Sequence, residues 1–173
     1  MRVGWNVFPI TVPAAATTVT KSMTTLTLHS EPLQHGWLDA YGHLNEAYYL
    51  VPFSNASWRM QDAFGIGVAY FERSGCALYT LETHLRYLKE VRAPAELAVE
   101  TLILGADAKR IHFAHLLVVD GDLRATGEFM ALHYDTRAGR SAPLPGATLA
   151  KLKEAQVDKL PAWAGRRIGF GQP

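Results

Sequence analysis

The 173-residue sequence lacks several features that would mark a specialised class of protein. Its single cysteine, Cys76, rules out an internal disulfide framework and a thiolate zinc site, and agrees with a reducing compartment. The formal charge of +1 gives no broad positive field for nucleic acid. No stretch approaches the roughly 20 apolar residues that span a bilayer. We therefore expect a soluble cytoplasmic protein with no nucleic-acid or membrane partner.

The remaining composition is that of one globular domain, with 49% hydrophobic and 19% charged residues. The first residues loosely resemble a signal peptide, but Pro9 and Pro13 interrupt their apolar run and only one positive charge precedes it. We expect residues 1–22 to be a poorly ordered extension or the product of a wrongly assigned start, with Met23 as the true start. The main domain is then expected over residues 23–145, followed by a C-terminal helix and tail over 146–173.

The first half of the expected domain combines one strand with one long helix. Residues 25–29 alternate polar and apolar side chains, which is the period of a half-buried strand. Residues 33–43 have neither period and predict a structured loop. Residues 45–64 are apolar on most faces and precede Gly65, so they predict a helix covered by other elements, with a kink at Pro52.

The second half predicts four strands joined by short turns. Such turns require antiparallel neighbours, and a curved antiparallel sheet of about five strands wrapped around the long central helix satisfies the pattern, an α+β arrangement. In the first of these strands the alternate residues from Ala77 to Tyr87 predict one mainly buried face. The tail after residue 146 has a modest helical pattern, and residues 165–169 are typical of a surface segment. The expected strands are residues 77–91, 95–105, 110–119 and 123–135.

The stretch from Trp37 to Tyr49 joins the loop to the start of the helix, and it is where chemistry is expected. A helix start offers unpaired backbone N–H groups that stabilise negative charge on a carbonyl oxygen, so the amide of Glu46 is a candidate donor. Asp39, in the loop just before it, can activate water or attack directly. Spacing alone equally allows Asp39 to cap the loop and Gly42 to supply a turn.

This stretch resembles the Asp-x-x-Gly-His-x-Asn-Asn-x-x-Tyr signature of hotdog-fold thioesterases of the 4-hydroxybenzoyl-CoA thioesterase type. The second asparagine is replaced by Glu46, which leaves a role only for the backbone amide at that position. The resemblance implies a hotdog fold, Asp39 as the catalytic carboxylate, the Glu46 amide as the group that polarises the thioester, and a site at a dimer interface. The matching residues are Asp39, Gly42, His43, Asn45 and Tyr49.

Shorter motifs at residues 81–84, 109–113, 140–143 and 165–169 resemble thioesterases of carnitine breakdown, which act on betainyl-CoA. That resemblance implies a small cationic acyl group. Aromatic faces attract such cations, and aromatic side chains cluster around the expected site, although they can equally pack the helix against the sheet. The aromatic candidates for substrate binding are Trp37, Tyr41, Tyr48 and Tyr49.

Other polar residues have both a functional and a structural interpretation. His43 can orient the carbonyl or hold the loop. Near the strand ends, a phosphate of coenzyme A can be met by Arg86, Lys89, Arg92 or Arg110, although each can equally remain solvated. Glu82 and His84 share one strand face, which suits either substrate binding or a solvent or interface face. We expect no metal, because His112 and His115 point to opposite sides of a strand, and no cofactor, because coenzyme A belongs to the substrate.

The expected function is hydrolysis of an acyl-CoA thioester by a homodimer or homotetramer. Hotdog hydratases and dehydratases are less favoured, because the sequence has no His-Phe-Pro-Gly and no Asp-x-Asn-Pro-x-x-His segment. A non-catalytic acyl-CoA-binding protein stays open as an alternative, although the presence of Asp39 argues against it.

Overall fold

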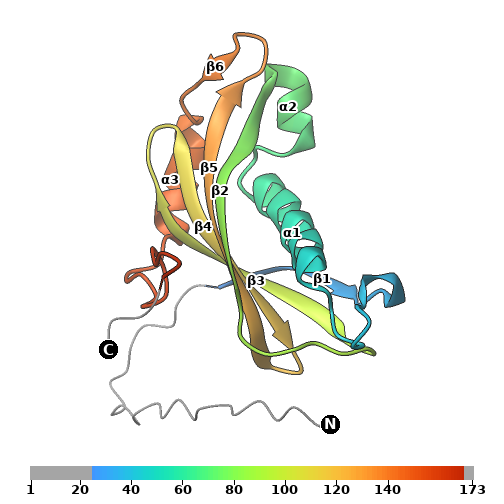
Figure 1. The fold of residues 1–173 in the computed structure, drawn as a ribbon. Coiled ribbons are helices and arrows are strands. Elements are labelled where there is room, and N and C mark those ends of the chain that lie inside the picture. The colour runs from blue at the N-terminus through green and yellow to red at the C-terminus, as the bar shows by residue number, and fades with distance from the viewer. Residues whose placement is uncertain (1–24, 170–173) are drawn as a thin grey trace, which may run out of the picture.

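The alternating segments of the sequence form one antiparallel sheet in the computed structural model, which describes residues 25–169. The sheet curls around helix α1 (Leu50–Ala63), while helix α3 (Gly146–Ala155) lies on the opposite face (Figure 1). The predicted α+β fold with about five main strands is therefore confirmed. In spatial order the strands are β1 (Leu26–Pro32), β3 (Glu96–Ala106), β4 (Arg110–Val119), β5 (Asp122–Asp135) and β2 (Cys76–Tyr87), and the short β6 (Arg140–Ser141) pairs with β5.

Helix α1 forms the centre of the core because its apolar residues recur every three or four positions. Phe53, Ala56 and Met60 are fully buried against the sheet. The expected single helix is in fact a 3₁₀-helix, η2 (Glu46–Tyr49), followed by α1. The helix type changes ahead of Pro52, which is the third residue of α1, where an N–H group has no intrahelical acceptor. Proline is therefore tolerated there.

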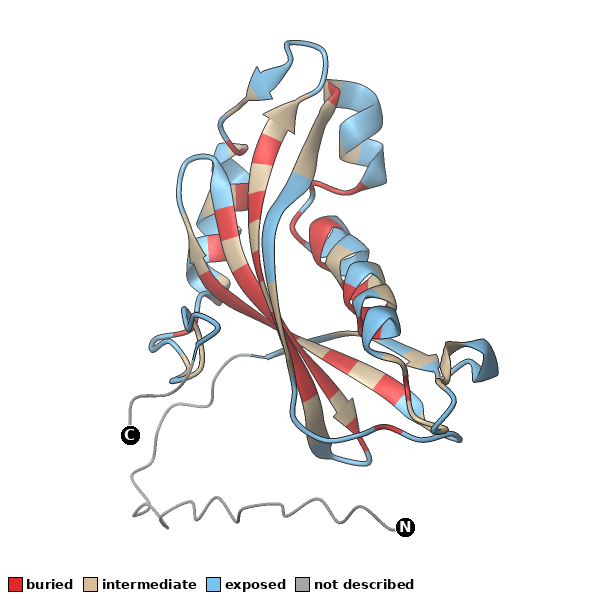
Figure 2. Ribbon diagram, in the orientation of Figure 1, coloured by how far each residue is buried: buried red, intermediate tan, exposed pale blue. Residues whose placement is uncertain are grey.

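Strand β2 differs most from its prediction. It is an edge strand, and Tyr79 and Leu81 are 47% and 58% exposed, so the predicted buried face is wrong along the middle of the strand. The pairing register with β5 also shifts between Thr80 and Glu82, which breaks the strict alternation on which that prediction depended. Figure 2 shows this exposed stretch in pale blue beside the buried residues of the neighbouring strands.

Two short elements were not predicted. Helix α2 (Val68–Ser74) follows Gly67 and ends at Gly75, which adopts a left-handed conformation with φ of 72°. Its seven residues are too few to show a helical period. Strand β6 has only two residues and is defined by its pairing with β5. A further 3₁₀ turn, η1 (His35–Trp37), lies within the expected loop.

The C-terminal segment packs on the outer face of the sheet. Val157 and Trp163 contact a second apolar cluster on β3 and β4, and the Val157 N–H donates to the Ile103 carbonyl at 2.9 Å. Farther along, the Gly165 N–H donates to both carboxylate oxygens of Glu128, at 2.8 and 3.0 Å. The predicted surface segment is exposed, but it is anchored to β5. The expected extension over residues 1–22 lies outside the described residues.

No helix within residues 25–169 is long and apolar enough to cross a membrane.

Candidate active site

The loop that carries Asp39 is closed by its own backbone. The Asp39 N–H donates to the His43 carbonyl at 2.8 Å, and the Gly42 N–H donates back to the Asp39 carbonyl at 3.0 Å. Gly42 has a φ of 78°, a conformation that glycine adopts without steric cost. Asp39 Oδ1 accepts hydrogen bonds from the backbone N–H groups of Tyr41 and His43, at 2.8 and 3.1 Å. These bonds hold the carboxyl group in one orientation.

The same bonds keep Asp39 ionised. Donation from the His43 N–H, with a smaller contribution from the Tyr41 N–H, lowers the pKa of Asp39 below its ordinary value of 3.8. Oδ2, in contrast, has no hydrogen-bond partner within residues 25–169. One oxygen of the ionised carboxylate therefore holds the loop by hydrogen bonds. The other oxygen is available to accept a proton or to attack a carbonyl carbon.

The helix start next to this loop provides a backbone donor. Asn45 is the N-cap of η2, and its side-chain oxygen accepts from the Ala47 N–H at 3.0 Å. Its backbone is also held in place, because the Asn45 N–H donates to the Trp37 carbonyl at 2.9 Å. The N–H of Glu46, the first residue of η2, has no acceptor among the described residues. It is therefore available to a carbonyl oxygen of a ligand.

The loop and the helix start line one cavity of about 440 Å³. Its other wall is the end of β2 and the segment that follows, of which the sequence analysis named only Lys89, as a candidate contact for a coenzyme A phosphate. That wall is brought to the loop by tertiary pairing, since the Leu44 N–H donates to the Val91 carbonyl at 2.8 Å and His43 bridges to Arg92. The lining residues are Asp39, His43, Leu44, Asn45, Glu46, Tyr49, Tyr87, Leu88, Lys89 and Glu90.

His43 has a definite electrostatic partner in this wall. Its Nε2 atom lies 2.8 Å from Glu90 Oε2, although the ring N–H is not aligned for a hydrogen bond. The ring therefore faces a carboxylate while its backbone N–H binds Asp39. This arrangement serves the loop-holding role of His43 and also leaves the ring at the edge of the cavity.

Comparison with known proteins gives a consistent family. The model of the thioesterase-like superfamily matches residues 33–152. The chain is 40% identical over 147 residues to the L-carnitine dehydrogenase/betainyl-CoA thioesterase of Agrobacterium fabrum, covering 83% of this chain but only 30% of that protein. It is 37% identical over 151 residues to the betainyl-CoA thioesterase of Pseudomonas aeruginosa, covering 84% of this chain and 95% of that protein.

The chain belongs to the thioesterase-like superfamily. This membership, together with the thioesterase names of its relatives, confirms the predicted class of enzyme. The matched region includes the Asp39 loop, the helix start and the end of β2, so the whole cavity lies inside the thioesterase-like part of the chain.

Two solved structures of similar proteins share the fold of this chain. A protein from Pseudomonas putida described as a candidate thioesterase is 34% identical, with a TM-score of 0.71 over 86% of this chain and 98% of that one. A Staphylococcus aureus protein solved in complex with CoA is 25% identical, with a TM-score of 0.77 over 90% of this chain and all of that one. The predicted hotdog fold is confirmed by this likeness.

Three of the four aromatic candidates for substrate binding are not among the residues that line the cavity. Trp37 and Tyr48 stack on each other with ring centroids 6.1 Å apart, and Tyr41 is 82% exposed at the tip of the loop. Tyr49 alone of the four lines the cavity, where its ring meets that of Tyr87 edge to face at 5.0 Å. The binding roles of all four stay predictions.

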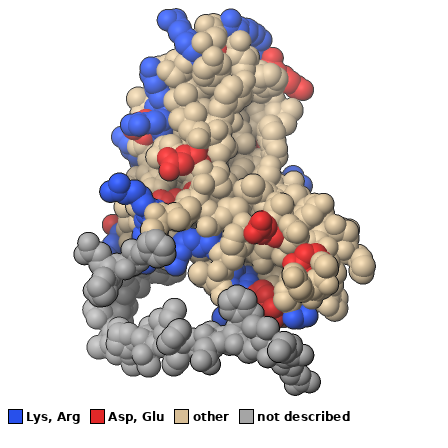
Figure 3. Space-filling view, viewed as in Figure 1, with Lys and Arg blue, Asp and Glu red and all other residues tan. Residues whose placement is uncertain are grey.

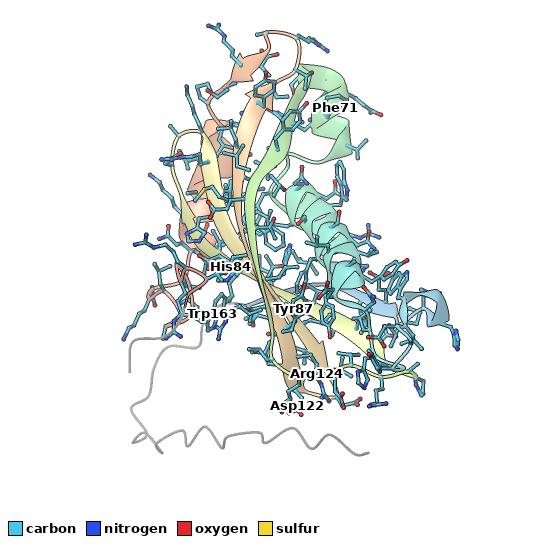
Figure 4. The ribbon with its side chains drawn as sticks, viewed as in Figure 1. Phe71, His84, Tyr87, Asp122, Arg124 and Trp163 are labelled. Carbon is cyan, nitrogen blue, oxygen red and sulfur yellow. The ribbon has the colours of Figure 1, made fainter. Side chains whose placement is uncertain are left out.

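Glu82 and His84 belong to a different cavity in this chain. They line a space of about 250 Å³ on the outer face of the sheet, together with His112, Glu128 and the C-terminal segment at Gly165. In Figure 4 His84 lies on the side of β2 that faces Trp163 and the C-terminal segment. Their assignment to substrate binding also stays a prediction.

Arg110 is paired with Asp107, with Nη2 and Nε at 2.6 and 2.8 Å from the same carboxylate oxygen. This contact lies at the start of β4, and Arg110 is not among the residues of the Asp39 cavity. A phosphate contact for Arg110 stays a prediction.

Within residues 25–169, no group of three or more His, Cys, Asp or Glu side chains is arranged to hold a metal ion. His112 and His115 diverge as expected. The His112 ring meets Glu128 on the outer face at 2.7 Å, and the His115 ring is buried between the hydroxyls of Ser57 and Thr101.

Proposed function

We propose that this protein hydrolyses an acyl-CoA thioester to a free acid and coenzyme A in the cytoplasm, with betainyl-CoA as the substrate. One observation supports the chemistry above all: Asp39 Oδ2 and the Glu46 N–H, both without partners among the described residues, belong to residues that line one cavity. The printed names of the Agrobacterium and Pseudomonas relatives support the acyl group.

In the general-base route, Asp39 Oδ2 takes a proton from a water molecule as the water oxygen attacks the thioester carbonyl carbon. The negative charge that develops on the carbonyl oxygen is stabilised by the Glu46 N–H at the positive end of the helix start. The intermediate then collapses, the C–S bond breaks, and the coenzyme A thiolate takes the proton from the Asp39 carboxyl group. The acid leaves and gives its remaining proton to the solvent, and Asp39 is ionised again.

In the nucleophilic route, Asp39 Oδ2 attacks the same carbonyl carbon and expels the thiolate, which forms a mixed anhydride that water then hydrolyses. Both routes use the same two groups. Multiple turnovers in H₂¹⁸O, followed by mass spectrometry of the peptide that holds Asp39, can identify the nucleophilic route. Label in the Asp39 carboxylate arises only when water attacks the aspartyl carbonyl of the anhydride, which the general-base route does not form.

The proposed activity is tested by thiol release from a panel of acyl-CoA thioesters, with betainyl-CoA among them. We expect turnover of betainyl-CoA that exceeds the turnover of straight-chain acyl groups of similar length. Tight binding of acyl-CoA without any thiol release would favour the alternative of a non-catalytic acyl-CoA-binding protein. Conversion of an enoyl-CoA to its hydroxyacyl-CoA without thiol release, measured by mass spectrometry, would favour a hydratase.

We further propose that the working form is a homodimer, or a homotetramer that consists of two such dimers. β2 is an edge of the sheet, and an edge strand presents unpaired N–H and C=O groups to another chain. Tyr79, Leu81 and Tyr87 are all about half exposed along it, so pairing two β2 strands about a two-fold axis would cover apolar surface. Light scattering should report at least a dimer at micromolar concentration, and Leu81→Lys should shift it towards monomer.

A further inference from the structure

The Asp39 cavity has a negative electrostatic environment. Three carboxylates line it, those of Asp39, Glu46 and Glu90, and its one Lys or Arg is Lys89, which is paired with Asp122 at 3.0 Å. Figure 3 shows exposed acidic side chains at the lower right of this face, where Figure 1 places the start of α1 and the loop before it. A cation therefore gains more from this cavity than a neutral group of the same shape.

The carboxylates differ in how far they are already compensated. Glu90 lies 2.8 Å from His43 Nε2 and 3.4 Å from Arg92 Nε. Asp39 is held by backbone N–H groups. The carboxylate of Glu46 has no hydrogen bond or ion pair among the described residues.

An aromatic ring lies next to Glu46. The Tyr87 hydroxyl donates to the Glu46 backbone carbonyl at 3.1 Å, and its ring packs edge to face on Tyr49 at 5.0 Å. Burial raises the pKa of Tyr87, and the charge of Glu46 raises it further, which places that charge close to the phenol. Tyr87 is 49% exposed, so part of its ring surface is open to a ligand. Aromatic faces attract quaternary ammonium groups.

The proposed substrate brings its cation to the same place. In a betainyl thioester one methylene separates the reacting carbonyl carbon from the quaternary nitrogen, so the two atoms are about 2.5 Å apart. A thioester positioned for attack by Asp39 and for donation by the Glu46 N–H must therefore hold its trimethylammonium group inside the same cavity.

We propose that Glu46 is the residue that selects for a cationic acyl group, and that its carboxylate and the ring of Tyr87 together contact the quaternary ammonium of the thioester. This inference rests on the proposed thioesterase activity. It also gives a physical reason for the carboxylate at the position where the resembled signature has asparagine, since the backbone amide serves the carbonyl oxygen and the side chain serves the cation.

The test compares two thioesters that differ only in charge. Betainyl-CoA and 3,3-dimethylbutyryl-CoA have the same shape, because a quaternary carbon replaces the nitrogen in the second. We expect wild-type kcat/KM to favour betainyl-CoA, and Glu46→Gln to reduce that preference by about tenfold, as expected for a charge contact in a partly screened cavity. The readout is the ratio of the two kcat/KM values, because any disturbance of the Glu46 backbone amide would lower both values alike and leave their ratio unchanged.

Two further variants isolate the contact. Glu72→Gln on α2 removes the same charge from an exposed position outside the cavity and should leave the preference unchanged. Tyr87→Phe keeps the ring and should keep most of the preference, whereas Tyr87→Leu should lower it. Tetramethylammonium chloride should inhibit the wild type more than sodium chloride at equal ionic strength, and Glu46→Gln should remove that difference.

The possible failures are distinguishable. Absence of thiol release from every acyl-CoA overturns the proposed function, and the inference with it. Equal kcat/KM for the two thioesters in the wild type overturns the cationic preference and leaves the thioesterase standing. An equal loss on both thioesters in Glu46→Gln, with an unchanged ratio, shows that Glu46 only supports the helix start and overturns its role in selection.

Discussion

Asp39→Asn is the most direct perturbation of the proposed site, because the structure separates the two jobs of this carboxylate. The amide oxygen of asparagine can accept the same two hydrogen bonds from Tyr41 and His43 that Oδ1 accepts now, at 2.8 and 3.1 Å. The amide nitrogen then occupies the position of Oδ2, where it can neither accept a proton nor attack a carbonyl carbon. The loop is kept and the chemistry is removed.

The expected loss follows from that substitution. General acid–base assistance contributes about 10²- to 10⁴-fold, so kcat/KM for betainyl-CoA should fall within that range. Since Asp39 is ionised well below neutral pH, wild-type kcat/KM should also be flat from pH 7 down to about pH 5, where a carboxyl group of pKa below 3.8 remains charged. The far-ultraviolet circular dichroism and the melting temperature should be close to those of the wild type.

Asp135→Asn is a matched control. Asp135 Oδ1 also accepts two backbone N–H groups, from Arg137 and Ala138, each at 2.9 Å, and these bonds lower its pKa as well. It is the last residue of β5, paired with Cys76 and Arg140, and it is not among the residues that line the cavity. Asp135→Asn should therefore keep full activity. If Asp39→Asn costs less than about tenfold in kcat/KM, Asp39 is not the central catalytic group.

Three other outcomes follow from the packing. Gly127→Ala should cost about 1–3 kcal/mol in urea unfolding, because its Cβ would lie 2.7 Å from the buried Phe129 ring; an unchanged midpoint would contradict this packing. Glu128→Ala should speed trypsin cleavage after the arginines beyond Gly165, whose N–H it binds, and equal cleavage rates would count against the anchor. Burial lowers the pKa of His115 to about 3, so only the unfolded chain is protonated just below the ordinary value of 6.5. The stability of the protein should therefore fall as pH drops from about 6.5 towards 3. In thermal melts at a series of pH values, the melting temperature of His115→Phe should fall less steeply with falling pH than that of the wild type. An equal pH dependence in the two proteins would refute this role of His115.

The half of the cavity that holds Asp39 was predictable because its geometry is local. Asp39, Gly42 and His43 are joined by hydrogen bonds that span at most four residues, and Asn45 caps the helix two residues on. A short motif can therefore encode this half completely. Strands β3, β4 and β5 were predicted to within one residue at each end for the same reason, since alternation is a property of neighbouring residues. The strand predicted over residues 77–91, in contrast, already ends at Tyr87.

The predictions that were wrong concern features of the structure that depend on contacts between residues far apart in the sequence. Whether a strand is central or at an edge depends on its partners, so the alternation of β2 could not show that Leu81 is exposed. A bulge between Thr80 and Glu82 is equally a matter of pairing with β5. The outer-face contact of Glu128 with Gly165 joins residues 37 positions apart, which no local pattern specifies.

The difference between local contacts and contacts across the sequence also matters for the proposed function. The groups proposed for bond cleavage, Asp39 and the Glu46 N–H, lie in one continuous stretch, while Tyr87 and Glu90 reach the cavity only through the pairing of β2 with β5 and the bond from Leu44 to Val91. A change in the end of β2 can therefore alter the shape and charge of the acyl site without disturbing the hydrogen bonds that hold Asp39. In that case substitutions at Tyr87 should change the ratio of kcat/KM between acyl groups, whereas substitutions at Asp39 should lower kcat/KM for all of them.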